Sequence, residues 1–127
     1  MASKKIVKKS AARKSVKAKK PAKVADAFLG QYVIIRGHDT GVFFGKLVSR
    51  RDCGIGRQEV VLSDGRRIWE WYGPETLSGV ASVGVNNSNS KVESAPEGKL
   101  AMVSDATEIL VCTDVAIASI KAARFAR

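Results

Sequence analysis

The chain has 127 residues, the length of one domain with appendages. It carries 22 Lys and Arg against 12 Asp and Glu, which gives a formal net charge of +10, and 45% of its residues are hydrophobic. With two cysteines, no CxxC spacing and no long apolar run, the sequence argues against a disulfide framework, a cysteine metal site and a transmembrane helix.

The excess positive charge lies in an N-terminal arm, residues 1–25. Residues 1–24 hold ten basic side chains and no acidic one, whereas the rest of the chain holds twelve of each. A dense block of one sign is typical of a disordered interaction tail. Residues 17–23, with the sequence KAKKPAK, resemble the tails of linker histones and of some bacterial histone-like proteins. The ten basic residues are Lys4, Lys5, Lys8, Lys9, Arg13, Lys14, Lys17, Lys19, Lys20 and Lys23.

After the arm, short apolar runs alternate with glycine-containing turns. Residues 32–36 predict a strand that is buried on both faces, because the run is too apolar for clean alternation. Residues 42–48 predict a second strand, in which Gly45 indicates a bulge or a sharp bend. Residues 49–57 are polar, contain two glycines and predict a loop.

Two further strands are predicted at residues 58–62 and 66–72. Between them stands Asp64-Gly65, which favours a type I′ hairpin turn because both central residues of that turn need a positive φ. Trp69 and Trp71 alternate onto the same face of the second strand. Core packing is the favoured interpretation for at least one of them, and Trp69 is expected there together with Phe44. The alternative is a surface on which nucleic-acid bases stack.

The C-terminal third predicts less regular structure and then a helix. Residues 75–84 allow one helical turn, and residues 85–96 predict a mobile polar loop. Two more strands are predicted at 99–103 and 108–112. A helix is predicted at about residues 113–125, with Thr113 as its N-cap.

These elements predict a fold that is mainly β with a C-terminal helix. Short strands at close spacing, bent at glycines, are typical of a small antiparallel barrel of the SH3-like or OB-like kind. The domain organisation is therefore a disordered basic arm at 1–25 and a barrel domain at 26–127.

Three segments carry a resemblance to a known family. They are residues 41–47 (GVFFGKL), residues 66–71 (RRIWEW) and residues 108–112 (EILVC) before the terminal helix. Over roughly residues 31–125 the chain resembles a family of small uncharacterised proteins encoded mostly by tailed bacteriophages. The resemblance implies a phage or prophage origin, and it implies no activity and no established site.

Catalysis finds little support in the sequence. The single histidine, His38, stands beside Asp39 in a predicted turn, where such a pair is typically solvated. The segment Gly54-Ile55-Gly56 is too short for a P-loop or a dinucleotide-binding fingerprint. We therefore expect a non-enzymatic protein with no catalytic residue, no metal site and no cofactor.

Nucleic acid is the partner that the charge pattern favours. Each Lys that neutralises a phosphate releases a counterion, and a Lys-rich arm does this without reading sequence. Arg50, Arg51, Arg66 and Arg67 extend the predicted contact region onto the barrel, although Asp52, Glu59 and Asp64 stand close enough in sequence to pair with them. The alternatives for the arm are a solubilising tail and a segment that binds an acidic protein surface.

The sequence therefore predicts a phage-type protein that binds nucleic acid, DNA rather than RNA, through its basic arm. The alternative is a structural virion component, such as a minor capsid or decoration protein, whose arm threads between subunits or contacts the packaged genome. Other virion proteins would then be partners, and an oligomer is compatible with this hypothesis. The expected location is the host cytoplasm or the virion, because the N-terminus lacks the apolar core of a secretory signal. No membrane partner is expected, because no apolar run is long enough to span a bilayer.

Overall fold

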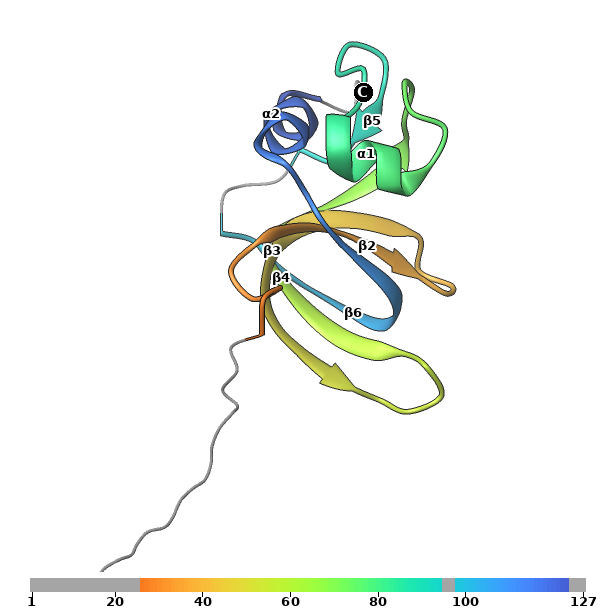
Figure 1. Ribbon diagram of the computed structural model, residues 1–127, viewed down its shortest axis with the longest axis vertical. Coiled ribbons are helices and arrows are strands. Elements are labelled where there is room, and N and C mark those ends of the chain that lie inside the picture. The colour runs from red at the N-terminus through yellow and green to blue at the C-terminus, as the bar shows by residue number, and fades with distance from the viewer. Residues whose placement is uncertain (1–25, 95–97, 124–127) are drawn as a thin grey trace, which may run out of the picture.

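The computed structural model of the protein describes residues 26–94 and 98–123 (Figure 1). The arm expected at residues 1–25 lies outside the described residues, as does the end of the expected C-terminal helix. In chain order the elements are β2 (Tyr32–Gly37), β3 (Val42–Asp52), β4 (Gln58–Glu70), α1 (Leu77–Val83), β5 (Lys91–Val92), β6 (Leu100–Val111) and α2 (Asp114–Ala122).

Four strands form a small closed antiparallel barrel, as the sequence predicted. The sheet order is β3-β2-β6-β4-β5, and an additional pairing between β3 and β4 closes the ring. The two-residue strand β5 lies outside the ring and pairs only with the end of β4. The helices α1 and α2 contact each other and lie together beyond one side of the barrel, next to β5 (Figure 1).

Two buried clusters fill the molecule, and β2 contributes to both. Val33 and Ile35 lie in a cluster with Phe43, Leu47, Val60, Leu62, Val103 and Ala106, which we call the barrel core. Ile34 points the other way, into a cluster with Phe44, Ile68 and residues of both helices, which we call the helix-side core. All three β2 side chains are fully buried, so the prediction of a strand buried on both faces is confirmed.

The predicted hairpin turn at Asp64-Gly65 is wrong. Residues 58–70 form one strand, and both halves of that strand pair with β3. Asp64 has the positive φ of 58° that a type I′ turn needs, but Gly65 does not, so the chain bulges without reversing. The bulge faces Gly45, and a Cβ there would approach Leu62 Cβ and Ser63 O to 3.0 Å. The irregularity predicted at Gly45 is therefore confirmed.

Three other boundaries differ from the sequence-based expectation. The strands predicted at 99–103 and 108–112 are one strand, β6, whose first half pairs with β4 and whose second half pairs with β2. The loop predicted at 49–57 is shorter, because β3 continues to Asp52 and forms a hairpin with β4. The loop predicted at 85–96 contains β5.

Both helices begin at a threonine N-cap. The side chain of Thr113 accepts a hydrogen bond from the backbone N–H of Ala116, which confirms the predicted cap of α2. Ala116 and Ile120 bury one side of α2 in the helix-side core. The helical turn expected within residues 75–84 is α1, with Thr76 as its N-cap.

Candidate nucleic-acid interface

The predicted contact residues fall into two groups. The ten basic residues of the arm lie outside the described residues. The four arginines of the barrel are all described, and the structure distributes them over different surroundings. Arg50 and Arg51 lie on β3, and Arg66 and Arg67 lie on β4.

Arg50 lies at one end of the barrel and binds a carboxylate. Its Nε is 2.6 Å from Asp26 Oδ2, its Nη2 is 3.1 Å from Asp26 Oδ1, and its guanidinium lies 4.9 Å from the centre of the Phe28 ring. Hydrogen bonds from Arg50 and from the backbone N–H of Phe28 lower the pKa of Asp26 below its ordinary value. The bidentate pair cancels the charge of Arg50 and makes it a poor candidate for binding phosphate.

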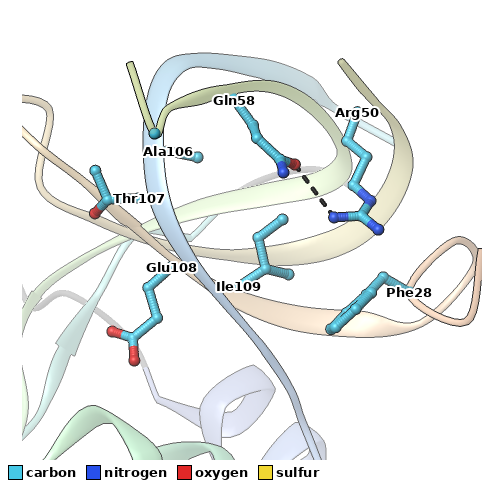
Figure 2. Close-up of a pocket in the computed structure, with 8 residues that line it drawn as sticks. Phe28, Arg50, Gln58, Ala106, Thr107, Glu108 and Ile109 are labelled. Atoms are coloured by element: carbon cyan, nitrogen blue, oxygen red, sulfur yellow. Dashed lines mark hydrogen bonds between the residues drawn. The ribbon is translucent and has the colours of Figure 1, made fainter. Parts of the chain in front are cut away.

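A pocket of about 190 Å³ opens beside Arg50. In Figure 2 Phe28 lies below the guanidinium, Ile109 points into the space, and Arg50 Nη1 meets Gln58 Oε1 at 3.3 Å. The other lining residues are Gly56, Ala106, Thr107 and Glu108. Because Arg50 is already bonded to Asp26 and Gln58, and Glu108 is paired with Arg36 at 3.0 Å, the pocket offers no unpaired charged group among its lining residues.

Arg51 is also paired with a carboxylate, as the sequence allowed. Its Nη2 lies 2.7 Å from Glu59 Oε1 across the β3–β4 hairpin. The side chain of Arg51 is 70% exposed, so this ion pair contributes little stability and a phosphate can compete for the guanidinium. Asp52, in contrast, accepts a hydrogen bond from the backbone N–H of Gly54.

Arg66 lies near a buried polar network that the sequence analysis missed. Asp64 is 6% exposed, and its carboxylate accepts hydrogen bonds from the backbone N–H of Gly98 and, at 2.8 Å, from the Tyr32 hydroxyl. Lys121 on α2 donates to the same hydroxyl at 3.0 Å. The hydrogen bond from Gly98 holds the pKa of Asp64 below its ordinary value, and the hydrogen bond from Tyr32 and the nearby charges of Lys121 and Arg66 act in the same direction.

This network has a structural explanation. It joins the β4 bulge to the start of β2 and to the last turn of α2, three parts of the chain that are far apart in sequence. The Nε of Arg66 is buried and has no hydrogen-bond acceptor among the described residues, so this atom of the guanidinium is not available to a phosphate. The Asp-Gly pair could have indicated a buried bulge only if the partner strand had been known.

Arg67 lies at the other end of the barrel, between two aromatic rings. Its guanidinium is 4.4 Å from the centre of the Phe43 ring and 5.1 Å from that of Trp69, and it donates a hydrogen bond to the backbone carbonyl of Thr40. The acceptor of this side-chain bond is a neutral carbonyl. We call Phe43, Arg67 and Trp69 the Arg67 stack.

The two tryptophans differ in burial. Trp71 packs against the helix-side core and donates from Nε1 to the carbonyl of Pro74 at 2.9 Å, which confirms core packing for one tryptophan. Trp69 is 58% exposed, so its placement in the core is wrong, whereas Phe44 is fully buried as expected. Trp69 packs beside the guanidinium of Arg67, which in turn lies over Phe43. The spacing of Arg67 and Trp69, two apart on one strand, was the signal that could have revealed the Arg67 stack.

Two other features of the sequence bear on chemistry, the single histidine and the metal-ligating residue types. His38 Nε2 and Asp39 Oδ1 are 3.8 Å apart on the surface. No group of His, Cys, Asp or Glu in residues 26–94 and 98–123 could hold a metal ion. None of the helices in this part of the chain is long and apolar enough to cross a membrane.

The comparisons with known proteins give a family without an assigned activity. No curated protein and no solved structure shows significant similarity to the chain. One family matches residues 30–120, which include the whole barrel and most of α2. The chain therefore belongs to the family described as Domain of unknown function (DUF6948).

Proposed function

We propose that the protein binds nucleic acid through its basic arm, with DNA favoured over RNA and with little dependence on sequence. The observation that carries this proposal is the separation of charge along the chain. Ten basic and no acidic residues occupy positions 1–24, whereas the described residues contain ten basic and eleven acidic side chains. The attraction for a polyanion must therefore come mainly from the arm.

The ion pairs on the barrel support the same division. Acidic residues cancel much of the positive charge that the barrel carries, so a phosphate backbone would have to displace a carboxylate at each of these sites. The pairs are Arg36–Glu108, Arg50–Asp26, Arg51–Glu59, Lys91–Glu70 and Lys99–Glu93.

Binding by the arm follows from the chemistry of lysine. An ammonium group is a point charge with three donors, and it lacks the planar fork with which arginine recognises guanine edges. Each phosphate that it neutralises releases condensed counterions, so the affinity should fall steeply with salt concentration.

The test compares the full chain with a variant that lacks residues 1–24. Deletion should leave the melting temperature of the barrel unchanged and abolish most of the affinity for a labelled duplex. For the full chain, log K should fall with log salt at a slope of about −0.9 per phosphate engaged on duplex DNA. Two unrelated duplexes of equal length serve as the control for sequence dependence. Unchanged affinity after the deletion, or a tenfold preference for one duplex, would contradict the proposal.

The second candidate function is a structural virion component, in line with the phage origin that the sequence resemblance implies. An exposed apolar strip on the outer face of the barrel favours it. Leu100 and Met102 on β6 are 66% and 62% exposed, and Met102 pairs with Val61 on β4. Val48, on the strand β3 that pairs with β4, is 50% exposed. Such a strip suits contact with another protein. Absence of DNA affinity from both the full chain and the deletion variant would favour this function.

A further inference from the structure

We propose that the Arg67 stack is a platform for an unpaired nucleic-acid base, so that the protein prefers single-stranded to duplex nucleic acid. This inference rests on the proposed function, because the arm would supply the electrostatic attraction. The Arg67 stack would add a stacking contact that the paired bases inside a duplex cannot make.

The first support is an exposed aromatic ring that is fixed from below. Trp69 is 58% exposed, while Phe43 at the base of the stack is only 9% exposed. Arg67 lies between them, 4.4 Å from one ring centre and 5.1 Å from the other, and its bond to Thr40 fixes the guanidinium. A ring held in this way loses little conformational freedom when a ligand stacks on it.

The chemistry of the stack favours a base over other partners. Every base has a flat π-face, and stacking on an aromatic side chain is tolerant of sequence, which agrees with an arm that reads none. In a duplex the faces of all bases except those of the terminal pairs are covered by their neighbours, so along a strand Trp69 can stack only on unpaired bases. The guanidinium beneath the indole adds a positive charge to the platform.

The surrounding charges are compatible with a polyanion. Glu93 accepts a hydrogen bond from the backbone N–H of Arg67 at 3.1 Å and is paired with Lys99 at 3.0 Å. Glu70, also on β4, is paired with Lys91 at 3.5 Å. The side-chain acceptor of Arg67 is a carbonyl, so this bond leaves the charge of the guanidinium intact. A phosphate next to the stacked base would therefore face the guanidinium of Arg67 and carboxylates that are already paired.

The experiment measures binding of the full chain to a labelled oligothymidine of about 15 nucleotides and to a duplex of the same length. Trp69→Ala should weaken oligothymidine binding about fivefold to a hundredfold, the range that alanine substitution of a stacking residue gives. Its affinity for the duplex should stay the same. Trp69→Phe should retain part of the preference, and Val115→Ala, which removes another exposed apolar side chain, should change neither affinity.

A second measurement separates stacking from a change in folding. In the Trp71→Phe variant Trp69 is the single tryptophan, and its fluorescence should be quenched by oligothymidine but not by the duplex. Equal losses for both probes in Trp69→Ala, or no quenching, would overturn the inference while leaving the arm as the binding element. If deletion of residues 1–24 had no effect while Trp69→Ala abolished binding, the proposed role of the arm would fail and the platform would remain.

Discussion

Both ends of the barrel carry an arginine stacked on a phenylalanine, but the two guanidinium groups donate to different acceptors. At each end an arginine lies over a phenylalanine: Arg50 over Phe28 and Arg67 over Phe43. Arg50 is neutralised by the carboxylate of Asp26, whereas Arg67 donates to the carbonyl of Thr40. The Arg50 end borders a pocket, and the Arg67 end carries an exposed tryptophan.

The two arginines therefore differ in the acceptor of the guanidinium and not in the stacking itself. The two hydrogen bonds from Arg50 to the carboxylate of Asp26 attach the segment before β2 to β3. A carbonyl orients the arginine without cancelling its charge. Of the four arginines predicted from the sequence, only Arg67 combines this position with an exposed aromatic partner.

The largest effect should come from removing the phenylalanines. Phe43→Ala should lower the free energy of unfolding by about 3–5 kcal/mol, because Phe43 belongs to the barrel core. Phe28→Ala should cost less, because Phe28 is only partly buried. Chemical denaturation of both variants checks the order, and an equal loss would mean that the two ends are equivalent in stability.

A smaller effect should follow when each arginine is replaced by lysine. Arg50→Lys loses the bidentate bond to Asp26 and should lower the melting temperature by a few degrees. Arg67→Lys loses the planar group between the rings and should increase the mobility of Trp69, seen as a lower fluorescence anisotropy in the Trp71→Phe background. Each variant acts as the control for the other, and an effect of Arg50→Lys on Trp69 would show that the ends are coupled.

The smallest effect should be a difference in acid sensitivity. The folded pKa of Asp26 is lowered, so its bond to Arg50 stabilises the fold above the ordinary carboxyl pKa and is lost as the pH falls below about 4. The Thr40 carbonyl does not titrate, and Glu93 accepts a hydrogen bond from the backbone N–H of Arg67 rather than from its guanidinium. The NMR signal of the Arg50 Nε–H should therefore move on acidification while that of Arg67 moves less, and the reverse order would contradict the assignment of partners.

Local signals in the sequence predicted much of the fold. The apolar run of β2, the glycine opposite the bulge and the threonine cap of α2 all depend on nearest neighbours, and all three are confirmed. The prediction of a turn at Asp64-Gly65 failed because a residue with positive φ is compatible with a turn and with a bulge alike. The outcome is decided by β3, which is long enough to pair with both sides of the bulge, and by Ala101, whose Cβ would lie 2.6 Å from a Cβ added at Gly65.

The candidate site was less predictable because its contacts join distant residues. Arg67 meets Phe43 and Thr40 across 24 and 27 positions of the chain, and Asp26 meets Arg50 across 24. In the sequence Asp52, Glu59 and Asp64 stand close enough to pair with the four predicted arginines, and of these three Glu59 forms a salt bridge, with Arg51. Pairing across a barrel depends on strand register, which composition does not reveal.

The order of the strands also governs when this protein can fold during its synthesis. β2, near the start of the barrel, is completed only by β6, which pairs Val33 with Val111. Until β6 has been synthesised, the ring is open between β2 and β4, and the buried side chains of these two strands are exposed to solvent on that side. Closure of the barrel therefore waits for β6, and a chain that stops before β6 should depend on chaperones or be degraded.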